Sequence, residues 1–232
     1  GMNEGRRPRV SLTSLGCKVN QYEMRAAAEE FHRRGFEVVP FGAPADACLV
    51  NTCSVTHEAD VKSRAVLRRA ARSGEDPVVV ATGCYAEMAP GAVGAISGVT
   101  AVVPNAEKPR LADVVEDLLR RSGRLLFELG DAAPAAPEGL LALEEGPLSR
   151  TRAVLKVQDG CNHFCSFCII PFARGRLASR NPEEVAAEAE RLAAAGYREL
   201  VLTGICVGDY GDERGFPQRG DGRDPLARLL ER

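Results

Sequence analysis

The stretch DGCNHFCSFCIIPFARG, residues 159–175, places three cysteines in one short loop. Cys161, Cys165 and Cys168 follow one another at spacings of four and three, and three such thiolates can hold three corners of a cubane iron–sulfur cluster. An electron-transfer cluster takes four thiolates, and no fourth cysteine follows nearby, so one iron is left open for another ligand. Two other interpretations stay open: a zinc site with an open position, and a disulfide between two of the three.

The segments on either side of this loop predict a β-loop-α-β unit. Residues 153–157 (AVLKV) and 199–203 (ELVLT) have the pattern of strands. Between them, residues 181–196 begin with a capping Asn and a Pro and end at a Gly, which indicates a helix. Such units are right-handed and build barrels whose active sites lie in the loops after the strands. We therefore expect Thr203 and Gly204 on the same face as the cysteine loop.

The barrel is expected to be incomplete in this sequence. Residues 225–232 predict the start of a further helix, and the printed sequence ends there. Two strands cannot close a barrel that takes about 200 residues or more. Residues 150–232 are thus predicted to be the first part of a (β/α) partial barrel. Upstream of it, residues 131–149 are rich in Ala, Pro and Glu and predict an interdomain linker, with a short strand or helix around residues 140–143.

The first 130 residues predict a separate domain built on a parallel sheet. Short apolar runs that end in small or turn residues alternate with helical stretches, which is typical of a parallel α/β fold. The strands are expected at residues 10–15, 47–50, 78–81 and 101–103, and the helices at residues 23–34, 59–72 and 111–121. The fold class predicted for the chain is α/β, an amino-terminal parallel domain followed by the partial barrel.

A cysteine follows each of the first three predicted strands: Cys17, Cys53 and Cys84. In a parallel sheet the ligand site lies beyond the carboxyl ends of the strands, so the three should meet at one edge. Each can also be read as a small buried hydrophobe. Three cysteines at the same place after three successive strands favour a second three-thiolate cluster site. Cys48, by contrast, lies inside a predicted strand and is expected in the core.

Composition narrows the function classes. The chain has 232 residues, 45% of them hydrophobic, and a net charge of −2, so any RNA contact must use local patches rather than a global positive field. No run approaches the ~18 apolar residues of a membrane helix. Eight cysteines without a secretory signal indicate metal ligands in a reducing compartment, which predicts a cytoplasmic protein with no membrane association.

With both cysteine sets in view, the chain resembles the methylthiotransferases of the radical S-adenosylmethionine superfamily. The superfamily signature is C-x3-C-x-aromatic-C, with Phe167 in the aromatic place. The matching motifs are SLGCKVNQYE, NTCSVTHEADVKSR, ATGCYAE, DGCNHFCSFCIIPFARG and VLTGICVGDYG. Residues 18–21 (KVNQ) resemble the branch that acts on N6-threonylcarbamoyl-adenosine beside the tRNA anticodon. Other branches act on isopentenyl-adenosine in tRNA or on a ribosomal-protein aspartate.

The resemblance implies two 4Fe–4S clusters and S-adenosylmethionine as cofactors. The open iron on Cys161, Cys165 and Cys168 would chelate S-adenosylmethionine, whose reductive cleavage yields a 5′-deoxyadenosyl radical that takes hydrogen from carbon 2 of the adenine. The second cluster, on Cys17, Cys53 and Cys84, would carry the sulfur that becomes the methylthio group. The implied partners are the tRNA anticodon stem-loop, a reductase and a sulfur donor.

Further site residues follow from the resemblance. Phe167 would line the adenine pocket of the cofactor, or else be a core aromatic. Thr203 and Gly204 would contact its methionine end through backbone groups. Arg174, and with it Arg176 and Arg180, would meet RNA phosphates or the cofactor carboxylate, or else be solvated surface groups.

Two departures from the family bear on these expectations. Cys206 stands where relatives are expected to have His or Asn, and it is a neutral change or a spare ligand, of which we favour the first. The remaining barrel strands and a small carboxy-terminal RNA-binding β-barrel are missing from the sequence. A non-catalytic iron–sulfur or zinc-binding module is therefore the rival interpretation.

Overall fold

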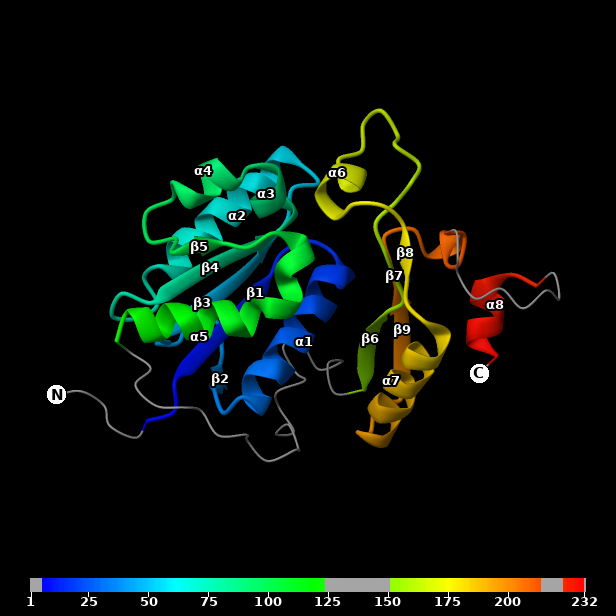
Figure 1. The fold of residues 1–232 in the computed structure, drawn as a ribbon, viewed down its shortest axis with the longest axis horizontal. Helices are drawn as coiled ribbons and strands as arrows, with labels where there is room; N and C mark the ends of the chain where they lie inside the picture. Colours follow the sequence, from blue (N-terminus) through cyan, green and yellow to red (C-terminus); the bar gives the residue numbers. More distant parts are fainter. Residues whose placement is uncertain (1–5, 124–150, 214–222, 232) are drawn as a thin grey trace. The chain divides into compact units, whose positions relative to one another are not determined.

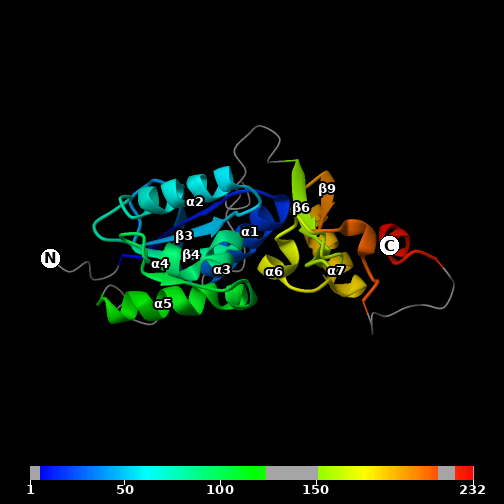
Figure 2. The ribbon, with the colours of Figure 1, turned by 90° about the horizontal axis from the view of Figure 1, so that it is seen from above.

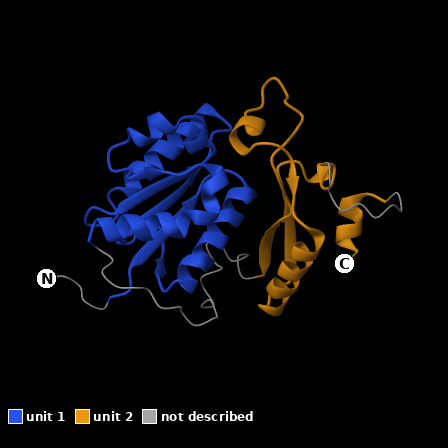
Figure 3. Ribbon diagram, in the orientation of Figure 1, with its two compact units in different colours: residues 1–143 blue, residues 144–232 orange. Residues whose placement is uncertain are grey.

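The computed structural model describes residues 6–123, 151–213 and 223–231. The chain divides into two compact units, residues 1–143 and residues 144–232 (Figure 3). The linker predicted at residues 131–149, with its short element around residues 140–143, lies outside the described residues. Within the described part of the chain, every helix is too short or too polar to cross a membrane.

The first unit is built on a five-stranded, fully parallel sheet with the strand order β2-β1-β3-β4-β5 (Figure 1). The strands are β1 (Arg9–Ser14), β2 (Glu37–Val39), β3 (Ala47–Thr52), β4 (Val78–Gly83) and β5 (Ala101–Val102). The helices are α1 (Lys18–Arg33), α2 (His57–Ala70), α3 (Cys84–Met88), α4 (Pro90–Gly94), a 3-10 helix (Asn105–Arg110) and α5 (Leu111–Arg121). The predicted α/β class is confirmed, and all four predicted strands are present.

Helices cover both faces of this sheet, so its central strands are buried on both sides. Phe31 of α1 and Val115 of α5 pack with Leu49 on one face. Leu67 of α2 packs with Val50 on the other face, where α3 and α4 also lie. Figure 2 shows α2 and α5 on opposite sides of the strands. Burial on both faces explains why β3 and β4 read as continuous apolar runs rather than as alternating ones.

Four elements of this unit depart from the sequence expectation: α1, β2, α3 and α4. Helix α1 begins at Lys18 instead of residue 23, because the chain reverses at Gly16, whose φ is +87°, and Val19 is already buried. Strand β2 was not expected, since only three residues form it at the edge of the sheet. The short helices α3 and α4 follow Gly83 within a stretch whose few residues give no clear helical period.

The second unit contains the predicted β-loop-α-β unit. Strand β6 (Arg152–Lys156) pairs in parallel with β9 (Glu199–Thr203), and α7 (Pro182–Ala194) connects them. The Asn181 side chain accepts a hydrogen bond from the Glu183 amide (2.8 Å), as a helix cap should. The remaining elements are the antiparallel pair β7 (Gln158–Asp159) and β8 (Ala178–Ser179), then α6 (Ile170–Arg174), a 3-10 helix (Val207–Asp209) and α8 (Pro225–Leu230).

Candidate metal centres

The structure places the first cysteine triad, Cys17, Cys53 and Cys84, at the carboxyl edge of the parallel sheet. The register sets Ser14 opposite Asn51 and Thr52 opposite Gly83. Cys53 and Cys84 are therefore the next residues on two paired strands, and Cys17 directly precedes α1 beside them. All eight cysteines of the chain have free thiols, so the disulfide interpretation is wrong.

Two glycines let the three strand ends approach closely. A Cβ atom on Gly16 would lie 2.5 Å from Sγ of Cys53, and one on Gly83 would lie 2.3 Å from the Thr52 carbonyl oxygen. Both glycines have φ near +90°, which disfavours any residue with a side chain. The backbones beside the three thiols are thus packed to a distance that glycine alone allows. This cradle and its three free thiols fit a cluster held by three thiolates.

Asn20 fastens two of these strand ends together. Its side-chain amide donates hydrogen bonds to the carbonyl of Leu15 (2.7 Å) and to that of Thr52 (3.2 Å). These carbonyls lie two residues before Cys17 and one residue before Cys53. A buried amide that satisfies two carbonyls fixes the backbone on both sides of it.

We expect Asn20→Ala to lower the free energy of unfolding by about 2 kcal/mol, because it leaves both carbonyls without this donor. Urea unfolding followed by circular dichroism measures the change. Gln21→Ala is the matched control, since Gln21 is the exposed neighbour in the same helix turn. Equal stability of the two variants would show that Asn20 does not hold the edge.

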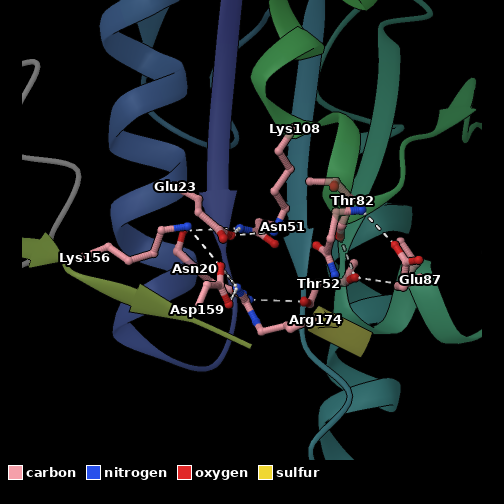
Figure 4. A network of polar contacts seen from close by, with 12 residues as sticks. Asn20, Glu23, Asn51, Thr52, Thr82, Glu87, Lys108, Lys156, Asp159 and Arg174 are labelled. Atoms are coloured by element: carbon pink, nitrogen blue, oxygen red, sulfur yellow. Dashed lines mark hydrogen bonds and ion pairs between the residues drawn. The ribbon is translucent and has the colours of Figure 1, made fainter. Parts of the chain in front are cut away.

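A second layer of polar contacts supports the same edge (Figure 4). The Thr52 hydroxyl donates to the Thr82 carbonyl (2.6 Å) and accepts from the Ala86 amide (3.0 Å), which joins β3, β4 and α3. Asn51 donates to Glu23 (3.0 Å), and Glu23 in turn pairs with Lys108. The Ser63 hydroxyl donates to the Cys53 carbonyl (3.0 Å) and accepts from its amide (3.2 Å). Sequence reasoning missed these supports, because they join residues far apart in the chain.

The second triad, Cys161, Cys165 and Cys168, lies in the loop that follows β7. Gly160 turns the chain into the loop with φ +65°, and a Cβ atom there would lie 2.0 Å from the Arg176 carbonyl oxygen. The Cys161 amide donates to the Gly175 carbonyl (3.2 Å), so the two ends of the loop are closed against each other. Cys161 is buried, Cys168 half-buried and Cys165 exposed. Three thiols in one closed loop fit a cluster that leaves one iron open.

Gln158 connects this loop with the loop after β9. Its side-chain nitrogen donates to the Gly160 carbonyl (2.6 Å), and its side-chain oxygen accepts from the Cys206 amide (2.9 Å). A Cβ atom on Gly204 would lie 2.6 Å from that same oxygen. Thr203, buried at the end of β9, accepts from the Val157 amide (2.9 Å). Thr203 and Gly204 therefore lie beside the cysteine loop, as the barrel topology predicts. Sequence reasoning missed Gln158, because a polar residue directly before Asp159-Gly160-Cys161 is typical of a turn.

The other predicted contact residues have distinct surroundings. Arg174 forms an ion pair with Asp159 (3.1 Å), which Lys156 also contacts (3.0 Å) (Figure 4). Arg174 is thus tied to the strand that leads into the cysteine loop and is not a solvated surface group. Arg180 pairs with Glu188 (2.7 Å), and Arg176 is exposed. Phe167 is 90% exposed, so the core-aromatic alternative for it is wrong.

A third group of side chains lies beside Cys161. The ring nitrogen Nε2 of His163 is 2.7 Å from a carboxylate oxygen of Asp209 and 3.9 Å from Sγ of Cys206. A hydrogen bond from the Cys206 thiol to Asp209, with burial and the carboxylate charge, raises the pKa of Cys206 to about 11. Cys206 is therefore a protonated thiol at neutral pH. Sequence reasoning missed His163 and Asp209, since the two residues lie 46 positions apart and share no local pattern.

Two family models match the chain, and they define its class. Residues 9–104 match the uncharacterized protein family UPF0004, and residues 155–214 match the radical SAM superfamily. The chain thus combines a segment similar to UPF0004 with a later segment similar to the radical SAM superfamily. It is 44% identical over 204 residues to the threonylcarbamoyladenosine tRNA methylthiotransferase MtaB of Bacillus subtilis, a match that covers 88% of this chain and 45% of that protein. These matches confirm the resemblance to the methylthiotransferases of the radical SAM superfamily that the motifs indicate.

Other relatives support the same family. The MtaB protein of Aquifex aeolicus is 36% identical over 90% of this chain and 50% of its own length. The ribosomal protein uS12 methylthiotransferase RimO of a Roseiflexus species is 33% identical over 95% of this chain and 49% of its own length. The chain spans about half the length of the curated relatives it matches.

Proposed function

We propose that the protein carrying this chain is a tRNA methylthiotransferase that adds a methylthio group to carbon 2 of N6-threonylcarbamoyl-adenosine beside the anticodon. The observation that carries the proposal is the presence of two separate cysteine triads, one at the strand ends of a parallel sheet and one in a closed loop. Sulfur insertion needs two such sites, whereas radical formation alone needs one. The similarity to MtaB proteins supports the choice of substrate.

Each triad has a role in this proposal. Cys161, Cys165 and Cys168 would hold a 4Fe–4S cluster with one open iron for S-adenosylmethionine; the other triad would hold the second cluster. When bound, the first cluster supplies the electron that cleaves S-adenosylmethionine, and the second supplies the transferred sulfur. Gln158 keeps the cysteine loop and the loop after β9 at a fixed separation, which would position the cofactor between them.

The surrounding residues would orient the cofactor. The backbone of Thr203 and Gly204 would bind the methionine end of S-adenosylmethionine, and the exposed ring of Phe167 would cover its adenine. Arg174 and Asp159 hold the base of the loop, so we assign Arg174 a positioning role toward the cofactor.

The proposal also names partners and a compartment. A reductase would deliver the electron, a sulfur donor would restore the transferred sulfur, and the tRNA anticodon stem-loop would be the substrate. Eight free thiols suit the reducing cytoplasm.

Mass spectrometry of tRNA nucleosides tests this function. Cells that lack the full-length gene should lose the methylthio form of N6-threonylcarbamoyl-adenosine and accumulate the unmodified nucleoside. The full-length gene should restore the methylthio form, and the same gene with Cys161→Ala should not. Persistence of the methylthio nucleoside in the deleted strain would rule out this substrate.

A second candidate follows from the similarity to RimO over nearly the whole chain. In that case the deleted strain would keep its tRNA modification and lose the methylthio group on ribosomal protein uS12. Mass spectrometry of ribosomal proteins from the same cultures separates the two candidates.

A further inference from the structure

We propose that Cys161, His163, Cys206 and Asp209 form a binding site for a single zinc-class divalent cation, which shares Cys161 with the three-thiolate cluster set and uses neither Cys165 nor Cys168. The geometry of the first three donors points to it. The ligand atoms of Cys161, His163 and Asp209 lie within 4.8 Å of one another. Donors around a tetrahedral zinc ion are about 3.5 Å apart, since its bonds are about 2.0 to 2.3 Å long. Small side-chain adjustments bring the three to that spacing.

Cys206 completes the set as the fourth donor. Its sulfur lies 3.9 Å from Nε2 of His163, and it stands three residues before Asp209 in the same loop. The hydrogen bond between Nε2 of His163 and the Asp209 carboxylate (2.7 Å) lies in the place that the cation would take. Binding therefore releases the thiol protons of Cys161 and Cys206 to solvent and replaces the hydrogen bonds of His163 to Asp209 and to Cys206 with metal–ligand bonds.

The backbone holds these donors in place before any ion binds. Cys161 and His163 belong to the loop after β7, and the His163 amide contacts Sγ of Cys161 (3.5 Å). Cys206 and Asp209 belong to the loop after β9 and its 3-10 helix, Val207–Asp209. The Gln158 side chain spans the two loops, because it donates to Gly160 and accepts from the Cys206 amide. A preorganised site loses little conformational entropy on binding.

The donor chemistry selects the class of ion. Two sulfurs, one imidazole and one carboxylate suit Zn²⁺ or a similar borderline cation, whereas Ca²⁺ and Mg²⁺ require oxygen ligands. The His163 side chain is 58% exposed, which leaves the ion a path from solvent.

Cobalt(II) titration tests the site, because thiolate–cobalt charge-transfer and ligand-field bands report the donors directly. The full 232-residue chain is used, reduced and metal-free, with Cys17, Cys53 and Cys84 replaced by alanine to remove the other triad. One tetrahedral Co²⁺ per chain is expected. Binding should persist in the Cys165→Ala/Cys168→Ala variant, since neither thiol belongs to the site.

The ligand variants give the opposite result. His163→Ala and Asp209→Asn should each weaken Co²⁺ binding by about tenfold or more, and Cys206→Ser should also remove about half of the charge-transfer intensity. Asp212→Asn, the same charge change three residues further along, is the matched control and should leave binding unchanged. The proposed site would be overturned if the Cys165→Ala/Cys168→Ala variant lost Co²⁺ binding while the Cys206→Ser variant bound Co²⁺ as the parent chain does. Absence of tetrahedral Co²⁺ bands would overturn it as well.

Because Cys161 would be a ligand of both the zinc ion and the 4Fe–4S cluster of the cysteine loop, the two should exclude each other. This consequence rests on the proposed function. Zinc added before anaerobic iron–sulfide reconstitution should lower the iron bound by the intact chain and have a smaller effect on the Cys206→Ser variant. Equal inhibition in both chains would contradict the competition. The cobalt readout contains no iron, so its outcome is separate from any failure of the cluster assignment.

Discussion

Replacing Cys17, Cys53 and Cys84 together by alanine is expected to remove one of two 4Fe–4S clusters and to leave the reductive cleavage of S-adenosylmethionine intact. The physical reason is that each triad lies within its own compact unit. The strand-end cysteines are held by the parallel sheet of the first unit, whereas the cysteine loop is closed by contacts among Gly160, Gly175 and Arg176. Removal of one set of ligands leaves the supports of the other untouched.

Iron analysis after anaerobic reconstitution and chromatography of 5′-deoxyadenosine measure the two effects separately. The triple variant should bind about half the iron of the unmodified protein. Replacing Cys161, Cys165 and Cys168 instead should halve the iron and abolish cleavage. Cys48→Ala is the matched control, because Cys48 is buried between Ser11 (3.1 Å) and Ser73 (2.9 Å) inside β3 and should retain all the iron. Unchanged iron content in the Cys17/Cys53/Cys84 variant would refute the assignment of a cluster to the sheet edge.

The main features of the fold and of both triads were predictable from the sequence, because they depend on local patterns. Apolar runs placed β1, β3 and β4, and parallel pairing then required Cys53 and Cys84 to emerge at one edge. Cys48 could be separated from these cysteines by the same logic, since it lies inside β3 and is fully buried.

The supports of the site were not predictable, because they are tertiary contacts without a local signature. Gln158 joins two loops that follow different strands, and Asn20 joins the ends of two strands. His163 and Asp209 meet because β6 pairs with β9, which brings the loops that follow these strands together. Arg174 shows the same limit: its position in the motif suggested a phosphate or carboxylate contact, and its ion pair with Asp159 emerges only from the fold.

Gly83→Ala is expected to destabilise the first unit by several kcal/mol, on the order of 4 kcal/mol. Gly83 has φ +94° and ψ −175°, a region essentially restricted to glycine, so a side chain there costs about 1–3 kcal/mol before any contact is counted. The added Cβ would also lie 2.3 Å from both the Thr52 carbonyl oxygen and Oδ1 of Asn51. The carbonyl is part of the backbone and cannot move without disrupting the pairing of β3 with β4.

The same substitution separates stability from cluster binding. Relief of the clash must move Cys84 away from Cys53, so a Gly83→Ala chain that still folds should lose the strand-end cluster and keep S-adenosylmethionine cleavage. Gly91→Ala is the control, because Gly91 lies in α4, a Cβ atom added there would have nothing within 4 Å, and the methyl group should raise the stability by about 0.5–1 kcal/mol. Urea unfolding and iron content are measured on both variants. A Gly83→Ala variant with the stability and iron content of Gly91→Ala would show that the close approach of β3 and β4 does not build the site.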